Sequence, residues 1–450
     1  MREVTLHDTL SGRLLPLRPR EPGTVGIYAC GPTVYGRVHV GNARPFVVFS
    51  LLKRFLQHEG YAVNFVANIT DVNDKIYAAA AAAGVSSQAL AAEMTAHYVA
   101  DTDRLGLGRP DHEPLASQMI PEIVALIERL IERGHAYVAD GDAYFAVRSY
   151  ERYGELSHRR LEDLDQGEGG EGAQRKRDPL DFALWKAQKP GEDTAWQTPW
   201  GSGRPGWHIE CSAMAQELLG LDFEIHGGGS DLTFPHHENE AAQTRAAYGQ
   251  PLARMWVHNG MLRLAQEKMS KSIGNTFMLH EALDAHGRDA LIMYFCSGHY
   301  RQPVEFDDER LAQASSNVRR FRELAHRLTP GPSPAWSAPL REEFFSALAE
   351  DFNTPRALAA AFAWASEANR SGTPVGEADL VEMLDVLALA DLLRVPVSEA
   401  PAEALELAQQ REAARAQRDW ALADLLRERL AELGWEVRDS PQGPELRPLA

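Results

Sequence analysis

Residues 24–69 constrain the fold more than any other stretch, because a strand, a helix and a second strand follow one another there. Residues 24–30 are rich in β-forming side chains, and residues 61–69 repeat that pattern. From Pro45 to Gly60 apolar residues recur at helical spacing, and Gly60 is a natural helix stop. A strand–helix–strand unit of this length predicts an α/β fold with a parallel, doubly wound sheet of the Rossmann type.

The sheet is expected to resume only after a long interruption. Residues 221–226 and 255–257 have strand patterns, and the glycines at 227–229 are expected to end the first of these strands. Residues 140–200 instead hold short aromatic strands and a Gly/Glu-rich stretch at 166–172. That composition predicts an inserted subdomain with a mobile loop rather than more of the sheet.

Helical patterns dominate after about residue 305, with Pro-rich breaks at 330–334 and 396–401. The basic C-terminal segment is expected to hold a helix near 420–433 and a strand-like end. The predicted division, in chain order, is a first Rossmann half at 1–135, an insertion at 136–204, a second Rossmann half at 205–260, a stem-contact region at 261–330, a helical bundle at 331–399 and a small C-terminal domain at 400–450.

Composition limits the class of protein. A chain of 450 residues with 44% apolar side chains is expected to form two to four domains with substantial cores. No apolar run approaches the roughly 20 residues needed to cross a bilayer, and the N-terminus lacks a secretory pattern. Only three cysteines occur, far apart, which predicts a reducing, cytoplasmic location and thiols used for metal binding or catalysis.

The formal net charge of −18 does not by itself indicate a nucleic-acid partner, because phosphate contacts need Lys and Arg. Local clusters matter more than the total, and basic runs lie at 175–177, 319–327 and 411–429. Each run is equally compatible with solvated surface. Charge alone therefore leaves the partner open.

The segment from Cys30 to Asn42 carries the first motif, His39-Val-Gly-Asn42. Ligands in doubly wound folds bind beyond the carboxyl ends of strands, and helix N-termini attract anions. His39 can donate to phosphate oxygens, and Gly41 lets a base or a phosphate approach the backbone. Alone, this motif is weak evidence, because such a pattern more often marks a capped helix start in which Asn42 satisfies backbone amides.

The second motif is Lys268-Met-Ser-Lys-Ser272, followed by Ile-Gly-Asn. Two lysines three residues apart, with hydroxyls between them, form a cationic loop suited to a polyphosphate and to the charge on a leaving pyrophosphate. The alternative is an exposed polar turn. The two motifs together, in this order around a strand–helix–strand unit, resemble the paired nucleotide-binding motifs of class I aminoacyl-tRNA synthetases.

A third group of residues suggests a metal. Cys30 precedes the first motif, Cys211 lies in Gly-Trp-His-Ile-Glu-Cys-Ser, and His236 and Glu240 are four residues apart behind Pro235. Side chains four apart on a helix share a face and can hold one ion. Two thiolates, an imidazole and a carboxylate form a reasonable zinc set. His237 and Glu238 are rival ligands by composition, and a buried cysteine is more often a small hydrophobe.

The resemblance extends through the chain to the branch of the class I synthetases that activates cysteine. It rests on the stretches Cys30-Gly-Pro-Thr-Val-Tyr35, His39-Val-Gly-Asn-Ala-Arg44, Asn68-Ile-Thr-Asp-Val-Asn-Asp74, Gly206-Trp-His-Ile-Glu-Cys-Ser212, His226-Gly-Gly-Gly-Ser-Asp231, Phe234-Pro-His-His-Glu-Asn-Glu240, Lys268-Met-Ser-Lys-Ser272, Ser297-Gly-His-Tyr300, Asp351-Phe-Asn-Thr-Pro355 and Asp419-Trp420. The sequence departs from the idealised His-Ile-Gly-His motif at Val40 and Asn42. Asn42 carries no titratable proton, so it is expected to position ATP rather than act as an acid.

The resemblance implies a role for each site residue. One zinc ion per chain would be held by Cys30, Cys211, His236 and Glu240. ATP, with Mg²⁺, would contact His39, Gly41, Asn42, Lys268, Ser270 and Lys271, of which the catalytic group is His39, Asn42, Lys268 and Lys271. The amino acid would lie near Gly31, Thr33, Thr70, Trp207 and His226.

The implied activity has two steps. L-cysteine and ATP would give cysteinyl-adenylate and pyrophosphate, and the cysteinyl group would pass to the 3′-terminal ribose of tRNA(Cys). Zinc would select cysteine over serine by binding the thiolate, which makes a separate editing domain unnecessary. The helical region and the C-terminal domain would bind the tRNA. The protein is expected to act as a monomer without a membrane partner.

Three other functions are compatible with parts of the pattern. A ligase joining activated cysteine to an amino sugar would share the zinc, ATP and lysine motifs, but it needs no anticodon-binding domain at 400–450. A zinc hydrolase is suggested by His236, His237 and Glu238, but it leaves the lysine motif unexplained. A non-catalytic RNA-binding protein would not need intact His39 and Lys268–Ser272.

Overall fold

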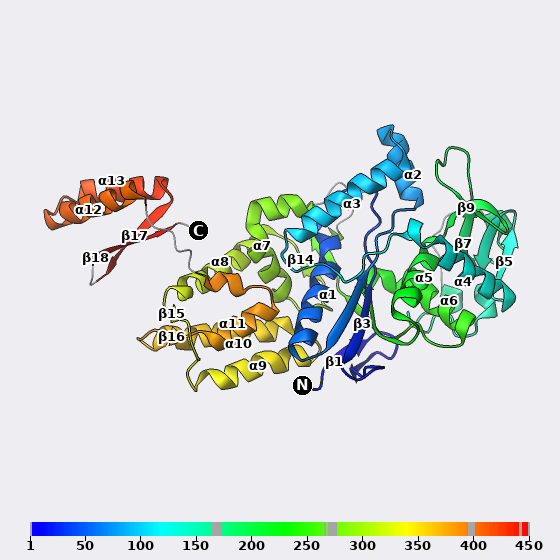
Figure 1. The fold of residues 1–450 in the computed structure, drawn as a ribbon, viewed down its shortest axis with the longest axis horizontal. Helices are drawn as coiled ribbons and strands as arrows, with labels where there is room; N and C mark the ends of the chain where they lie inside the picture. The colour runs from blue at the N-terminus through cyan, green and yellow to red at the C-terminus, as the bar shows by residue number, and fades with distance from the viewer. Residues whose placement is uncertain are drawn as a thin grey trace. The chain divides into compact units, whose positions relative to one another are not determined.

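A four-stranded parallel sheet carries the site. Its strands lie in the order β11 (Ala253–Asn259), β10 (Phe223–Gly229), β3 (Thr24–Ala29) and β4 (Ala62–Ala67), and every neighbouring pair is parallel. Helix α1 (Val40–His58) connects β3 to β4 and packs on the sheet (Figure 1). Because parallel strands end at the same edge, the residues that follow β3, β4, β10 and β11 meet there. The Rossmann-type α/β prediction is confirmed.

The computed structural model describes residues 2–163, 173–264, 267–268, 277–394, 401–440 and 443–448. The chain divides into two units, Met1–Leu393 and Arg394–Ala450. The predicted loop at 166–172 lies outside the described residues. The finer domain boundaries predicted within the first unit stay predictions.

Helix α1 begins five residues earlier than its apolar spacing predicts, at Val40 rather than Pro45. The His39 side chain caps it by accepting a hydrogen bond from the backbone N–H of Asn42 at 3.3 Å. A histidine is an unusual cap, so the usual signal of Ser, Thr, Asp or Asn is missing. As a result, Gly41 and Asn42 lie in the first helical turn and not in a preceding loop.

Strand β10 also differs from expectation, since it runs through Gly229 instead of ending before the glycines. The reason is the close approach of α1. A Cβ placed on Gly227 would lie 2.0 Å from Cζ of Phe49, a buried ring of that helix. The glycine therefore marks helix–sheet packing rather than a strand end.

The insertion forms its own antiparallel sheet. Strands β5 (Ala136–Ala139), β6 (Asp142–Phe145), β7 (Phe182–Ala187), β9 (Gly201–Pro205) and β8 (Trp196–Thr198) follow one another across it. Their apolar faces share a core with the helices that flank the insertion, α4 (Ile120–Glu132), α5 (Trp207–Leu219) and α6 (Glu238–Tyr248). The aromatic strands expected within residues 140–200 thus lie in this sheet, and the predicted insertion at 136–204 stays a prediction.

Helices occupy most of the rest of the first unit, as predicted beyond residue 305. Before the insertion come α2 (Asp74–Ala83) and α3 (Ser87–Asp103); after the sheet come β12 (Leu262–Leu264), β13 (Glu267–Lys268), α7 (Leu279–Ser297), β14 (Val304–Glu305), α8 (Asp308–Ala325), β15 (Leu328–Thr329), α9 (Ser337–Ala349), α10 (Thr354–Arg370), β16 (Val375–Gly376) and α11 (Ala378–Val386). One hydrophobic core joins these helices to α1, with Phe55, Phe345 and Trp364 fully buried in it.

The N-terminal hairpin ties the sheet to the helical region. It consists of β1 (Thr5–Asp8) and β2 (Arg13–Pro16). The backbone oxygen of Thr5 accepts the N–H of Asp351 at 2.9 Å. The Asp351 carboxylate in turn accepts the N–H of His7 at 2.9 Å and the hydroxyl of Tyr300 at 2.8 Å. Hydrogen bonds from both the backbone and the side chain of Asp351 thus join this residue to β1, which lies almost 350 residues earlier in the sequence.

The second unit is a small α/β module. It contains α12 (Ala402–Ala416), α13 (Trp420–Glu432) and the hairpin β17 (Trp435–Ser440) and β18 (Gly443–Pro448). Ala404, Leu430 and Trp435 form its core. In the described part of the chain, no helix is long and apolar enough to span a bilayer.

Candidate metal and nucleotide site

Four segments bring the predicted metal ligands together. Cys30 directly follows β3, Cys211 lies on α5, His236 lies in a π-helical turn (Thr233–His237), and Glu240 lies in the first turn of α6. All four side chains are buried. The helix opens at Glu238 rather than at Pro235, but the π turn still places His236 and Glu240 on one side, with Nε2 and Oε1 3.0 Å apart.

The spacing of these donor atoms suits one tetrahedral ion. Cys30 Sγ lies 3.5 Å from His236 Nε2 and 3.5 Å from Glu240 Oε1, and the donor atoms of all four residues lie within 4.8 Å of one another. Zinc bond lengths of about 2.3 Å to sulfur and 2.0–2.1 Å to nitrogen or oxygen give tetrahedron edges of about 3.3–3.8 Å. The donor types and their separations therefore fit zinc.

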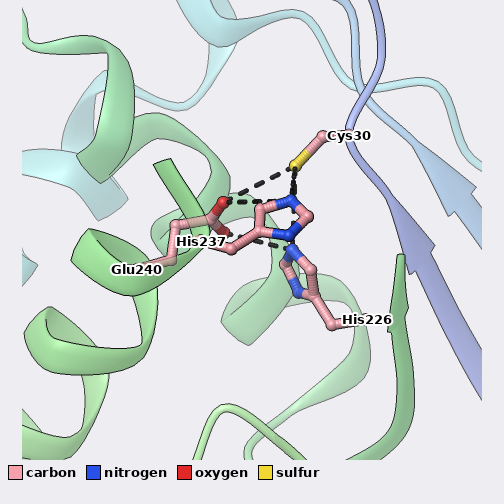
Figure 2. Close-up of side chains that lie close together, drawn as sticks. All are labelled: Cys30, His226, His237 and Glu240. Atoms are coloured by element: carbon pink, nitrogen blue, oxygen red, sulfur yellow. Dashed lines mark hydrogen bonds and ion pairs between the residues drawn. The ribbon is translucent and has the colours of Figure 1, made fainter. Parts of the chain in front are cut away.

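A second group of four residues shares two of these side chains. Figure 2 shows Cys30 and Glu240 together with His226 from β10 and His237 from the π turn. Cys30 Sγ lies 3.3 Å from His237 Nε2 and 3.7 Å from His226 Nε2. His237, which the sequence left open as an alternative ligand, therefore also lies close enough to Cys30 and Glu240 to bind a metal with them. The two groups differ in thiol number, since only the first contains Cys211.

Burial sets the protonation states of the cluster. It raises the pKa of the Cys30 thiol well above its ordinary value, with neighbouring Cys211 adding to the shift. Burial also raises the pKa of Cys211 and lowers that of His236 well below its usual range. The imidazole is consequently neutral, the form that binds metals, whereas both thiols must lose a proton to become ligands.

Glu240 supports the assignment of a cation to this cluster. Its carboxylate is fully buried. Oε1 lies 3.0 Å from His236 Nε2, and Oε2 lies 3.4 Å from His226 Nε2 but accepts no hydrogen bond within the described residues. Buried carboxylates are normally paired, hydrogen-bonded or bound to metal, because leaving one uncompensated is costly. A cation bound through Oε1 among the four donors would compensate the buried charge of the carboxylate.

Other buried rings orient the two candidate histidine ligands. Nδ1 of His236 lies 2.9 Å from Nδ1 of His208, and its ring stacks on Trp207 with centroids 4.1 Å apart. His237 Nδ1 lies 2.7 Å from Nε2 of His258. Contacts to the far nitrogen of a ligand histidine fix its ring and tautomer. His208 and His258 are functional candidates that the motif comparison did not single out.

A cavity of about 240 Å³ opens beside the cluster, at the carboxyl edge of the sheet. We call it the central cavity. Cys30 forms part of its wall, and its other lining residues include Gly31, Thr33, His39, Gly41, Asn42, Lys75, Trp207, Asp231 and Asn259 through Met261. The predicted metal ligand Cys30 and the first nucleotide motif thus face one space.

Two of the predicted substrate residues lie behind that wall. Thr70 is buried and donates its hydroxyl to Glu210 Oε2 at 3.4 Å. His226 is fully buried beside the second donor group. Gly31 lets the chain after β3 pass close to the backbone of Asn68, since a Cβ at position 31 would lie 1.7 Å from the backbone oxygen of Asn68. The structure therefore brings Gly31, Thr33 and Trp207 to the cavity, but not Thr70 or His226.

At the other side of the cavity, His39 has a defined orientation. Its Nδ1 accepts the N–H of Asn42, so Nε2 carries the ring proton in the neutral form. A Cβ on Gly41 would lie 2.9 Å from that ring, so glycine makes room for the imidazole. Of the second motif, Lys268 belongs by its backbone to β13; Ser270 and Lys271 lie outside the described residues.

Arg44 ends the matched stretch His39–Arg44, but no role was predicted for it. It is 1% exposed and donates to five backbone oxygens, those of Gly260, Met261, His299, Tyr300 and Gln302. Burial lowers its pKa to about 10. The guanidinium therefore fixes Gly260 and Met261, which line the cavity, to α1. An arginine in the apolar pattern of that helix was the available signal.

Family models match almost the whole chain. The model for the catalytic domain of class I (C) tRNA synthetases matches residues 16–316. A DALR domain matches residues 343–394, and a cysteinyl-tRNA ligase anticodon-binding domain matches residues 398–447. The last match does not favour the amino-sugar ligase, which needs no such domain.

Individual relatives agree over their full lengths. Cysteine--tRNA ligases from Pseudothermotoga lettingae and Alkalilimnicola ehrlichii are 44% and 46% identical to this chain. The matches cover 98% and 97% of the chain and 98% of each relative. A solved methionyl-tRNA synthetase from Mycobacterium tuberculosis, in complex with methionyl-adenylate, is 17% identical with a TM-score of 0.61, covering 82% of this chain and 90% of that one. At that identity the last likeness concerns the fold alone.

Proposed function

The chain belongs to the cysteine--tRNA ligase family, and from this premise we propose that it activates L-cysteine with ATP and transfers the cysteinyl group to tRNA(Cys). One feature carries the proposal. Cys30 is a member of the donor cluster and also lines the cavity that His39, Gly41 and Asn42 bound from the opposite direction. An amino acid recognised through sulfur would there lie next to a nucleotide.

Cys30, Cys211, His236 and Glu240 are the proposed zinc ligands, because this group supplies two thiolates. Zinc held there would favour the thiolate of cysteine over the hydroxyl of serine. The two amino acids are nearly isosteric, so a polar pocket without this preference would discriminate poorly. Trp207, stacked on His236, lines the cavity and would bound the space for the side chain.

Activation would follow by in-line displacement. The cysteine carboxylate attacks the α-phosphorus of ATP, supplied with Mg²⁺, and the bridging P–O bond to the β-phosphate breaks as pyrophosphate leaves. The Nε2 proton of His39 would be donated to a phosphate oxygen, and Asn42 would hold the nucleotide. Lys268, Ser270 and Lys271 would stabilise the charge on the leaving group.

Transfer to tRNA would use the same cavity. A hydroxyl of the 3′-terminal ribose attacks the carbonyl carbon of the adenylate, an ester bond forms, and AMP leaves with the electron pair of the broken C–O bond. The helices that follow residue 305 and the C-terminal module would bind the tRNA body and anticodon. We propose a monomer that works in the cytoplasm.

Cysteine-dependent exchange of pyrophosphate into ATP tests the proposal. We expect exchange with cysteine, little with serine, and its loss after zinc is removed by a chelator and its return when zinc is restored. Absence of cysteine-dependent exchange in zinc-loaded protein would reject the function. Exchange that survives complete metal removal would reject the role of zinc while leaving the activity in place.

A further inference from the structure

A second cavity lies beside the first, and none of the predicted site residues lines it. Its volume is about 370 Å³, against about 240 Å³ for the central cavity. We call it the side cavity. It is bounded by α2 and α3, by the segments that follow β4, and by strand β8 of the insertion, with Asp71, Asn73, Tyr77, Gln88, Thr95 and Trp196 in its wall. This size suits a ligand of several rings.

The first turn of α2 separates the two cavities. Lys75 lines the central cavity, whereas Asn73, Ile76 and Tyr77 line the side cavity. Neighbouring residues on a helix point in different directions, so one turn can serve both spaces. A single extended molecule could therefore occupy the central cavity with one end and the side cavity with the adjoining part.

The side chains of the wall suit a nucleobase. Tyr77 and Trp196 are aromatic residues of the wall, and bases stack on such rings regardless of sequence. The Arg204 guanidinium lies over one face of Tyr77, 5.2 Å from the ring centre, so Trp196 is the main candidate for stacking. Asp71 is held by Ser117, which donates its N–H at 2.9 Å to one carboxylate oxygen and its hydroxyl at 2.5 Å to the other. Each oxygen keeps a further lone pair, so the carboxylate can accept from the exocyclic amino group of cytosine or adenine.

Charge along the route is also appropriate for a nucleotide chain. Lys75 stands in the wall of the central cavity, with its Nζ 5.5 Å from the centre of the Tyr35 ring. No other lysine or arginine in the described ranges lines that cavity. A phosphate passing from one cavity to the other would cross the turn that carries this cation.

The two sides of the cavity are held together before any ligand arrives. The Tyr77 hydroxyl donates to the backbone oxygen of Thr194 at 3.1 Å, next to β8. Lys186 and Arg204 of the insertion both form ion pairs with Asp74 at the start of α2. Such preorganisation reduces the ordering cost of binding.

We propose that the side cavity binds a base of the single-stranded 3′ end of the tRNA while the terminal ribose occupies the central cavity. The inference rests on the proposed function, because it needs a polynucleotide whose last sugar reacts in the central cavity. The final bases of a tRNA, two cytosines and an adenine, all carry the amino group that Asp71 can recognise. Binding there would serve the second step of the reaction and not the first.

Replacement of one aromatic wall separates the two steps. For Trp196→Ala we expect cysteine-dependent pyrophosphate exchange within twofold of wild type. Single-turnover transfer from preformed cysteinyl-adenylate to tRNA should fall about tenfold to a hundredfold, as expected for one lost stacking contact. Trp196→Phe should restore transfer. Gln197→Ala, exposed on the same strand and outside the cavity wall, is the matched control with both steps unchanged.

Unchanged transfer in Trp196→Ala would overturn the inference. So would an equal loss of exchange and transfer, since it would assign the cavity to activation or to folding. If wild-type protein shows no exchange, the proposed function itself fails, which is a distinct result.

Crosslinking of the wild-type protein tests the inference without a variant, so its result does not depend on whether Trp196→Ala folds. Transcripts of tRNA with photoreactive 5-iodocytidine in place of the penultimate cytidine, which keeps the exocyclic amino group, should crosslink to peptides containing Tyr77 or Trp196. Crosslinks found only on other peptides would overturn the inference.

Discussion

The two ends of the central cavity are built differently. At the metal end Cys211, His236 and Glu240 are at most 1% exposed, and each comes from a different segment. At the nucleotide end His39 and Gly41 are only half-buried and Asn42 is exposed. The metal end consists of side chains fixed by other buried side chains, whereas the nucleotide end consists of one helix turn and its cap.

This contrast matches the demands of the proposed reaction. Choosing cysteine over serine requires donor atoms held within tenths of an ångström and shielded from water. ATP must enter and AMP must leave in every cycle, which favours an open end whose contacts are mostly with backbone and phosphate. Substitutions at the buried metal end should therefore abolish the recognition of cysteine. Substitutions behind the open nucleotide end should mainly weaken the binding of ATP.

The largest effect is expected from breaking the metal end itself. Cys211→Ser should remove bound zinc and lower cysteine-dependent exchange by about a thousandfold or more, because the ligand set loses a thiolate. Metal content and exchange are measured on the same preparation. Cys296→Ala is the matched control, since this buried cysteine lies outside the cluster, and it should keep both. Zinc retained with full activity in Cys211→Ser would contradict the assignment.

The pH dependence of zinc binding should distinguish the two donor groups. Burial raises the pKa of both Cys30 and Cys211, so the metal-free protein holds them as thiols near neutral pH. Zinc binding then releases two thiol protons, and affinity should rise about a hundredfold per pH unit below the thiol pKa values. The group with His226 and His237 contains one thiol and predicts about tenfold. Glu240 belongs to both groups, so its protonation does not affect the difference between these two predictions.

Calorimetry in two buffers of different ionisation enthalpy counts the released protons directly. A release of about two protons per zinc ion bound by the wild-type protein would support the proposed group, and a release of about one would favour the group with His226 and His237. A count unaffected by Cys211→Ala alone would instead favour the second group.

A smaller effect is expected one contact away from the metal. His208→Phe keeps a flat ring but removes the nitrogen 2.9 Å from His236 Nδ1. Loss of such an orienting contact typically weakens metal binding about 10- to 100-fold. Competition with a coloured chelator measures this affinity. Exposed His112 provides the control variant His112→Phe, and equal affinity in His208→Phe and wild type would show that His208 does not orient the ligand.

The smallest effect on activity is expected behind the open end. Arg44→Lys keeps the charge but cannot reach five carbonyl oxygens with a planar fork. The KM for ATP should rise about tenfold while the KM for cysteine stays within twofold, and the free energy of unfolding should fall by about 3 kcal/mol. Arg54→Lys on the same helix is the control. A rise in the KM for cysteine alone would break the proposed contrast between the two ends.

Local patterns were sufficient to predict much of the fold. The strand and helix between residues 24 and 58, the strand that follows, and the helices beyond residue 305 depend on spacing within about 15 residues, which a sequence displays directly. The metal ligands were predicted through motifs. Their convergence in space is observed, and the binding of zinc to them stays a prediction.

What the sequence did not reveal depends on contacts between distant segments. Gly227 lies inside a strand because Phe49 packs against it, some 180 residues away in the chain. Arg44 is recognisable as a structural anchor only once the carbonyl groups of residues 260, 261, 299, 300 and 302 surround it. The side cavity is formed by α2, α3 and the insertion together, so no single motif could indicate it.

The bond between β1 and Asp351 has a consequence for synthesis on the ribosome. His7 and Asp351 are 344 residues apart, and at about 5–20 residues per second the chain needs about 20 to 70 s to extend from one to the other. Throughout that interval the first strand lacks its partner from the helical region. Its remaining bonds are those of the β1–β2 hairpin and, once residue 256 has been made, those of Asp8 and Thr9 with the Trp256 backbone. Slow translation of the intervening segments would thus prolong the time for which β1 lacks this partner. The exposure would end when α9 and α10 leave the ribosome and Asp351 binds His7.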